Sequence, residues 1–508
     1  MPRRLIGALP ALSVCVLALT LTGCLSTAGI APQSKAPSAD GLAIDHAIRE
    51  AVREADWPAQ HWWHAFGDAQ LDHWVDLALE GSPSLALAAA RVRQAKALAG
   101  VVEADEHLQG TAQTTLKRHA WPQDQFYGPG ALSGAETWDN QANLGLSYAL
   151  DLWGRERNAS EQALDQAHMR VAEARQAELE LQNTVVKTYI GLSLQFARRD
   201  IVSDELRQQA QIVALAERRL AAGIGTEFEL SQAQAPLPET HRQLDALDEA
   251  IALARNQLAA LAGQGPGAGA SLGRPQLNLG APIGLPSALP AQLLGQRPDV
   301  VARRWQVAAQ ARGLDIAHAD FLPNVDLVAG LGFVATGGGA LSFLQGRKFN
   351  YSAGPALSLP VFDGGRLRAR LGVVAAGYDE AVAQYDQTLV NALRQVSDQL
   401  IRRDSLDVQA RLAAESVATA RKTFDIATLA FERGLTGYLE VLNAQTLLFR
   451  QQQIERQVQA ARLVAQAELV TALGGGVQAG RDVPEVRQEA APAAPAALAV
   501  FARQAASR

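Results

Sequence analysis

The sequence predicts an α+β fold that is internally duplicated, with four strands and several long helices in each chain. Three observations support this prediction. Two halves of the chain align with each other, short segments alternate apolar with small or polar residues, and the rest is rich in alanine, leucine, glutamine and arginine, which favour helices. Hydrophobic residues make up 48% of the 508 residues, so the chain can bury a large core.

The duplication is clearest in two segments that end in the same residues. GIGTEFELSQAQ begins at Gly223 and aligns with GLTGYLEVLNAQ, which begins at Gly434. The other aligned pairs begin at Ala78 and Leu293 and at Trp153 and Phe362. Because three pairs align in the same order, duplication is favoured over chance similarity between helical sequences. We therefore expect a first repeat over residues 61–270 and a second over residues 271–475.

Each repeat is expected to contain a helix of about 35 residues, two strands, a helix of roughly 65 to 70 residues, a glycine turn and a last helix. The strand candidates lie near Thr111–Arg118, Leu144–Leu150, Val325–Phe333 and Tyr351–Val361. Their small or polar face contains Gly145, Ser147, Gly330, Gly332, Gly354 and Ser358. A helix of about 67 residues is roughly 100 Å long, which suits a tubular body.

The N-terminus has the features of a secretory signal. Arg3 and Arg4 precede the apolar stretch Leu5–Leu21, and Leu21-Thr22-Gly23-Cys24 resembles the lipobox of bacterial lipoproteins. We expect a signal peptide over residues 1–23, N-palmitoyl and S-diacylglycerol groups on Cys24 and a lipidated tether over residues 24–60. The alternative is an ordinary signal peptide with a chance cysteine. Leu25 in place of an aspartate favours the outer membrane, and residues 476–508 are expected to be a disordered tail.

Membrane insertion would require strands from several chains. No later segment is apolar enough for a transmembrane helix, so a spanning chain would need a closed β-barrel. Four strands cannot close, since small barrels begin near eight strands. Two chains would give a plugged barrel, and three would give twelve strands around an open lumen. We therefore expect a homotrimer, in which the long helices continue the barrel as an α-helical tube; a soluble hairpin covering a core is the alternative.

Five stretches resemble the TolC-like outer-membrane factor family, in its lipoprotein, NodT-like branch. They are WWHAFGDAQLDHWVDLALEGSP, YALDLWGRERNASEQA, LPAQLLGQRPDVVARRWQVAAQARGLDIAHADFLPNVDL, GPALSLPVFDGGRLRA and FERGLTGYLEVLNAQ. The resemblance covers nearly all of residues 60–475. It implies a trimer, a twelve-stranded barrel in the outer membrane, an α-barrel in the periplasm and a periplasmic gate. It also implies two partners, a periplasmic adaptor (membrane fusion protein) and an inner-membrane pump.

The same resemblance suggests which residues meet the adaptor and which close the pore. The candidate adaptor-contact tips are Gly223, Ile224, Gly225, Thr226, Gly434, Leu435, Thr436 and Gly437. Their alternative role is to end helices, because glycine adopts positive φ readily. The candidate gate residue is Glu440, since a ring of three carboxylates would attract cations; a solvated helix carboxylate is the alternative. Its repeat mate Glu229 is a weaker candidate, and Asn443 stands where a second acid is expected.

Two further features bear on these sites. Pro236 and Pro238 should kink or restart the helix after the first tip. The motif HWWH contains His61 and His64, but a packed entry segment around the two tryptophans is favoured over a metal site.

The expected function is passive export of toxic small molecules, such as antibiotics, solvents or aromatic acids like fusaric acid. The alternatives are the outer-membrane component of a protein secretion system and a non-spanning periplasmic lipoprotein adaptor. No catalytic motif or cofactor site other than the covalent lipid on Cys24 is apparent, so an enzyme is not expected. The net charge of −6 has both signs interspersed, and no basic patch indicates nucleic acid as a partner.

Overall fold

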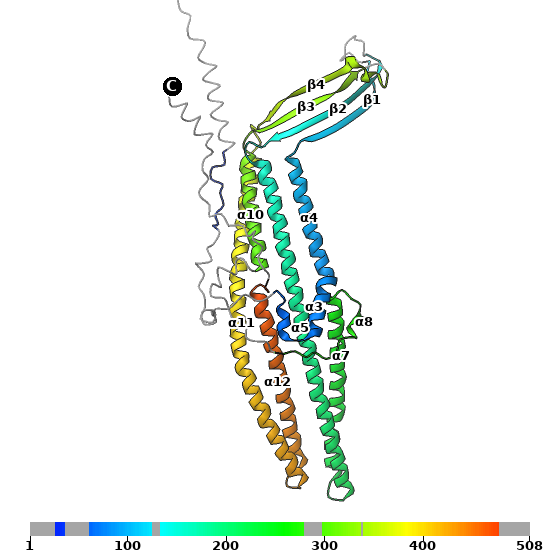
Figure 1. Cartoon of the computed structure of the whole chain (residues 1–508), viewed down its shortest axis with the longest axis vertical. Coiled ribbons are helices and arrows are strands. Elements are labelled where there is room, and N and C mark those ends of the chain that lie inside the picture. The colour runs from blue at the N-terminus through cyan, green and yellow to red at the C-terminus, as the bar shows by residue number, and fades with distance from the viewer. Residues whose placement is uncertain (1–25, 36–59, 124–132, 279–296, 337–338, 477–508) are drawn as a thin grey trace, which may run out of the picture.

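A curved sheet stands at one end of a bundle of long helices (Figure 1). The structure is a computed structural model that describes residues 26–35, 60–123, 133–278, 297–336 and 339–476. The predicted signal peptide, Cys24 and the predicted tail from residue 477 onward lie outside the described residues.

The sheet is antiparallel, and its four strands follow one another in chain order. They are β1 (Gln109–Ala120), β2 (Glu136–Leu150), β3 (Asn324–Thr336) and β4 (Phe349–Ser358). All four predicted strands are confirmed, and the first three are longer than expected. The fourth was predicted to reach Val361 but ends at Ser358, two residues before Pro360, which has no N–H for a ladder.

The register gives the sheet one apolar and one polar face. Leu144 lies opposite Leu331, which lies opposite Tyr351, and these residues share the apolar face. Gly145 lies opposite Gly330, which lies opposite Ser352, on the other face. The same alternation places every residue of the predicted small or polar face together.

The helices confirm the two predicted long elements, but neither helix of about 35 residues that was expected before a strand pair is found: the one in the second half has 22 residues, Pro298–Ala319. Helices α5 (Arg155–Ala221) and α11 (Arg366–Glu432) each have 67 residues. The predicted 35-residue helix of the first half is instead α3 (Ala69–Gly81) followed by α4 (Pro83–Asp105). The break falls before Pro83, because proline has no N–H and is accommodated in the first turn of a new helix.

The element order of the first half recurs in the second. There, α10 (Pro298–Ala319) leads to β3 and β4, which are followed by α11 and α12 (Tyr438–Ala472). In the first half, the last helix is divided into α6 (Glu227–Gln234) and α7 (Leu237–Leu261), as the two prolines predicted, and the short α8 (Pro266–Gly269) follows.

The helices near the sheet have the same order as the strands that they join. Helix α4 packs on α5, α5 on α10 and α10 on α11 (Figure 1). Farther from the sheet, α7 packs on α5, and α12 packs between α5 and α11. The chain is therefore one layer of helices, with α4 and α7 at one edge and α11 at the other.

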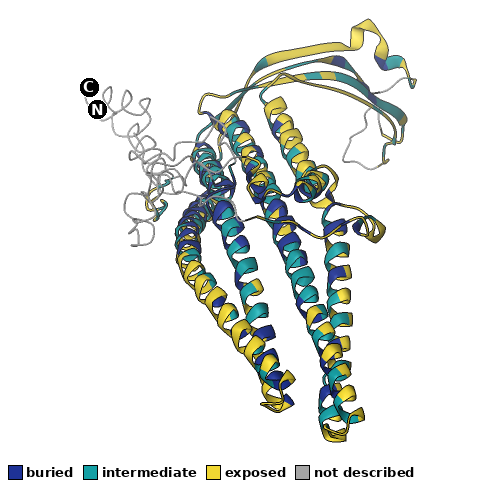
Figure 2. Cartoon of the chain, turned by 60° about the horizontal axis from the view of Figure 1, so that its bottom comes forward, coloured by how far each residue is buried: buried dark blue, intermediate teal, exposed yellow. Residues whose placement is uncertain are grey.

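The largest described core cluster lies where α3, α5, α7 and α12 meet. Short helix η2 (Trp62–Phe66) buries both tryptophans of the HWWH motif there, which confirms the predicted entry segment. Figure 2 shows buried residues along the seams and exposed ones on the outer faces of the helices. Tyr189, which is fully buried, donates to the Asp68 carboxylate at 2.9 Å.

None of the described helices has a segment both long and apolar enough to cross a membrane.

Candidate functional site

The two predicted tips lie at the end of the helical layer that is farthest from the sheet (Figure 1). Each begins with a glycine in the left-handed region, since φ is 71° at both Gly223 and Gly434. The next N–H folds back onto the preceding helix: Ile224 donates to the Arg219 carbonyl at 3.1 Å, and Leu435 donates to the Ala430 carbonyl at 2.9 Å. Both turns therefore end a 67-residue helix in the same way.

The helices that follow the tips begin differently. Thr226 caps α6: its hydroxyl accepts from the Glu229 N–H at 3.1 Å, and the Glu229 carboxylate accepts from the Thr226 N–H at 3.2 Å. This reciprocal pair is a capping box. Gly437 caps α12 and has no side chain to take part in such a pair. Glu229 therefore stabilises its own helix.

Glu440 occupies the position in α12 that Glu229 occupies in α6. Glu440 is exposed, and no hydrogen bond or ion pair among the described residues engages its carboxylate. Asn443 is also exposed, one turn farther along α12. The structure thus leaves Glu440 free for a solvent-filled space or a partner.

The tips carry apolar side chains that the chain itself does not cover. Ile224 and Leu435 are 67% and 73% exposed, and Phe228 and Leu439 are exposed on the first turns of the following helices. Such side chains at the end of a long bundle are typical of a contact with another protein. Phe228 and Leu439 are not among the tip residues that the sequence predicts. An apolar residue beside a charged one in the first turn of a helix could have indicated them.

A cluster just behind the tips joins the two halves of the chain. Phe431 of α11 packs on Tyr438 of α12 with ring centroids 6.0 Å apart, and the Arg219 guanidinium of α5 lies 5.2 Å from the Phe431 ring. Val441 of α12 is fully buried in this cluster. Burial also raises the pKa of the Tyr438 hydroxyl. Leu439, directly before Glu440, is exposed, whereas Val441, directly after it, is buried in this cluster. The cluster therefore holds the first turn of α12, which carries Glu440, in place.

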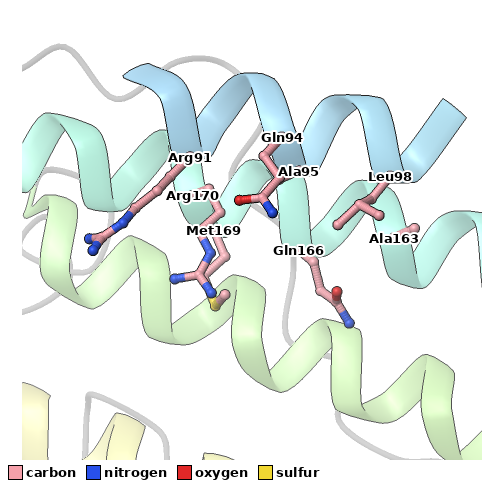
Figure 3. Close-up of a pocket in the computed structure, with 8 residues that line it drawn as sticks. All are labelled: Arg91, Gln94, Ala95, Leu98, Ala163, Gln166, Met169 and Arg170. Atoms are coloured by element: carbon pink, nitrogen blue, oxygen red, sulfur yellow. The ribbon is translucent and has the colours of Figure 1, made fainter. Parts of the chain in front are cut away.

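A groove of about 510 Å³ runs along α4 and α5 near the sheet. Figure 3 shows the eight residues that line it, among them Arg91 and Leu98 on α4 and Arg170 on α5. Helix α4 buries a single residue, Ala99, within the described part of the chain. This edge of the helical layer is therefore largely uncovered.

The described residues contain no group of three or more His, Cys, Asp or Glu side chains arranged to hold a metal ion. His61 stacks on His64, which lies 3.7 Å from the Asp72 carboxylate.

Comparison with known proteins identifies the family. The model of the outer membrane efflux protein family matches residues 74–264 and 289–475. The fusaric acid resistance protein FusA of Burkholderia cepacia is 44% identical over 481 residues, which cover 93% of this chain and 89% of that protein. The multidrug resistance outer membrane protein MdtP of Escherichia coli (strain K12) is 30% identical over 436 residues, covering 84% of this chain and 89% of that protein.

A solved structure agrees with this assignment. The outer membrane protein VceC of Vibrio cholerae superposes with a TM-score of 0.77 at 32% identity, covering 83% of this chain and 100% of that chain. The chain therefore belongs to the outer membrane efflux protein family and is an outer-membrane component of an efflux system.

Proposed function

We propose that the chain is one subunit of a homotrimeric, lipid-anchored channel that conducts toxic small molecules passively across the outer membrane. The observation that carries this proposal is a four-stranded sheet with an apolar and a polar face, whose edge strands β1 and β4 each have one neighbour among the described strands. In a membrane, each unpaired backbone group costs several kcal/mol. Three copies paired β4 to β1 would close twelve strands around a polar lumen.

The helical layer supports the same closure. Helix α4 exposes Leu87, Leu98 and Val101 at one edge. At the other edge, α11 exposes an apolar stripe that consists of Val390, Ile401, Val408 and Leu412. Their spacings of 11, 7 and 4 residues place the stripe on one helix face. A ring of three chains would bury both edges and continue the barrel as a tube in the periplasm.

The tips are proposed to meet a periplasmic adaptor, which joins the channel to an inner-membrane pump. The exposed Ile224, Phe228, Leu435 and Leu439 offer apolar contacts for helices of such a partner. The name of the relative FusA points to small aromatic acids as cargo, and we propose this class for the present channel. The lipid on Cys24 is proposed to anchor the subunit.

Glu440 is proposed as the gate residue. Three carboxylates held close in a wet pore repel each other by roughly 1–4 kcal/mol, and a cation offsets that repulsion. We expect Glu440→Gln to leave the trimer intact, to lower cation selectivity severalfold in planar bilayers and to weaken block by trivalent cations.

Glu229→Gln is the matched control, because that carboxylate already bonds its own helix N-terminus. Glu229→Gln should leave cation selectivity unchanged. An equal loss of cation selectivity in Glu229→Gln and Glu440→Gln would mean that both carboxylates line the pore. Asn443→Asp should raise cation selectivity if its position also faces the pore. Wild-type selectivity of Glu440→Gln at low salt, where screening is weakest, would refute the gate assignment.

The trimeric channel itself is tested by migration of the unheated and heated protein on a denaturing gel, together with its conductance. A band at three times the subunit mass that collapses on heating, and stable conductance steps, are expected. A monomer band without conductance would contradict the proposal.

A further inference from the structure

One face of α12 is uncovered over about its first five turns. Six exposed residues recur there with spacings of 3 and 4, which keeps them on one side of a packed helix. They are Glu440, Asn443, Leu447, Arg450, Ile454 and Gln457. On the opposite side, Val441, Gln445 and Leu448 are at most 3% exposed. The buried side fixes the rotation of α12, and we call the exposed side the Glu440 face.

The Glu440 face opens to one surface of the helical layer. Helix α12 packs between α5 and α11, so α11, and not α12, stands at the edge that would meet a neighbouring chain. The residues of this face therefore share one environment with Glu440. Because Glu440 is proposed as the gate residue, that environment is the lumen of the tube, and this step rests on the proposed function.

Arg450 is the next charged residue on this face after Glu440. It lies 10 residues farther along α12, or about 15 Å farther from the tips. Its side chain is exposed, and no hydrogen bond or ion pair within the described ranges engages the guanidinium. Since 15 Å exceeds the Debye length of about 8 Å at physiological salt, the two charges act separately on a passing ion.

The corresponding position of the first half carries a charge that its own helix neutralises. Continuing the alignment of GIGTEFELSQAQ with GLTGYLEVLNAQ places Glu239 opposite Arg450. The Glu239 carboxylate accepts two bonds from the Arg242 guanidinium of α7, at 2.6 and 2.8 Å. The second half thus differs from the first in sign and in having an unpaired charge, and three chains would supply three free guanidinium groups.

Apolar side chains stand on both sides of Arg450. Leu447 lies one turn nearer the tips and is 44% exposed, and Ile454 lies one turn farther from them and is 39% exposed. A guanidinium binds a carboxylate through two parallel N–H bonds, and it also stacks on aromatic rings. A guanidinium between two apolar side chains is therefore complementary to an aromatic ring that carries a carboxylate.

We propose that three Arg450 side chains form a cationic ring in the lumen, which binds aromatic carboxylates in transit. The guanidinium binds the carboxylate, and Leu447 and Ile454 contact the aromatic ring. Conduction requires that the cargo also leave, and a site that is open to water on one side releases it readily. The Arg450 ring thus gives the proposed cargo class, small aromatic acids, a site of matching charge beyond the acidic gate.

The Arg450 ring is tested in planar bilayers with the full-length trimer and two probe anions, benzoate and acetate. Each carries one carboxylate, and only benzoate has an aromatic ring. Arg450→Gln should lower the permeability of both anions relative to potassium severalfold. Arg450→Lys should keep the acetate permeability and lower that of benzoate, because an ammonium lacks the planar, bidentate group. Leu447→Gln combined with Ile454→Gln should lower the benzoate permeability alone.

Arg456→Gln is the matched control. Arg456 is also exposed on α12, but it lies about 120° around the helix from Arg450 and donates to Gln459 at 3.0 Å. This variant should leave both anion permeabilities unchanged. Wild-type permeabilities in Arg450→Gln, or an equal loss in Arg456→Gln, would overturn the Arg450 ring.

Glu440→Gln separates the Arg450 ring from the gate on which it rests. Altered cation selectivity in Glu440→Gln with wild-type anion permeability in Arg450→Gln would overturn the ring while the gate stands. Wild-type behaviour of both variants would remove the whole Glu440 face from the pore, and the proposed gate would fall with it.

Reaction of Arg450→Cys with a charged methanethiosulfonate reagent during recording tests the position directly. Conductance should fall in one step for each subunit, and Arg456→Cys treated in the same way should show no step. Labelling of Arg450→Cys that leaves conductance unchanged would place this face on the outside of the tube, where another protein could cover it, and would overturn the Arg450 ring.

Discussion

Asp68 is expected to hold three parts of the first half together, and its replacement should lower the stability of the whole channel. One oxygen of its carboxylate caps α3 by accepting from the Gln70 N–H at 2.9 Å. The other accepts from the Tyr189 hydroxyl of α5 at 2.9 Å and from the Gln276 N–H at 2.6 Å. Gln276 belongs to the segment that leads from the first half of the chain to the second, so one side chain joins α3, α5 and this connection.

The size of the effect follows from these bonds. Loss of a helix cap costs about 1 kcal/mol, and each hydrogen bond to a buried charge contributes about 1.5 kcal/mol or more. We therefore expect Asp68→Ala to lower the free energy of unfolding by about 4 kcal/mol. With an unfolding entropy of about 2 cal/mol/K per residue over roughly 400 residues, Tm should fall by about 5 °C.

Two variants divide this loss between the two oxygens. Asp68→Asn keeps the oxygen that caps α3 but places an NH₂ group against the Gln276 N–H, so about half of the loss should remain. Tyr189→Phe removes the bond to Asp68 and the bond that the Tyr189 hydroxyl accepts from the Gln70 amide at 2.7 Å, so it should cost about 1.5 kcal/mol or more. Asp76→Ala, on an exposed position of the same helix, is the control and should leave Tm unchanged.

The assay is thermal loss of helical circular dichroism at one protein and detergent concentration, because trimer stability depends on both. A Tm of Asp68→Ala within 1 °C of the wild type, or a fall as large in Asp76→Ala, would refute this account of the connection.

Three further outcomes are expected. Cys24→Ala should abolish incorporation of a palmitate analogue while the protein still inserts into the membrane; unchanged labelling would contradict the lipid anchor. Leu435→Glu should weaken cross-linking to the adaptor and leave the trimer intact, and loss of the trimer would instead make this turn purely structural. Since the pKa of Asp379 is lowered, the bonds that its carboxylate accepts from the Gln33 and Ser34 N–H groups should be complete at neutral pH and lost progressively as the pH falls below about 4. Amide protection of Gln33 relative to Asp379→Ala should follow that curve, and a pH-independent difference would exclude a role for the Asp379 charge.

The elements that the sequence predicted well are those with a regular local period. Strands β2 and β3 were found from strict alternation, and both 67-residue helices were found from continuous helical patterns. The restart at α7 was expected because a proline inside a helix removes a backbone hydrogen bond. These features depend on neighbours a few residues apart, which a sequence displays directly.

The break between α3 and α4 was missed although Pro83 was visible, since the flanking sequence continues a helical composition. The first strand was also underestimated, because its exposed, polar residues make the alternation weak. The two tips show a subtler case: the internal repeat aligns Glu229, the weaker gate candidate, with Glu440, but it does not show that only Thr226 supplies a hydroxyl that engages its glutamate in a cap.

The sequence by itself determined the family, the element types and the positions of the tips, because motifs and periodicities are local. Only the tertiary structure decided that Asp68 joins segments 208 residues apart and that Asp379 binds a backbone 345 residues away. Such bonds depend on where two distant segments lie in space, and neither partner carries a local pattern that names the other. The sequence likewise showed only that alternate residues of one strand share a face of the sheet. The strand register defined which glycines of neighbouring strands lie on the same face.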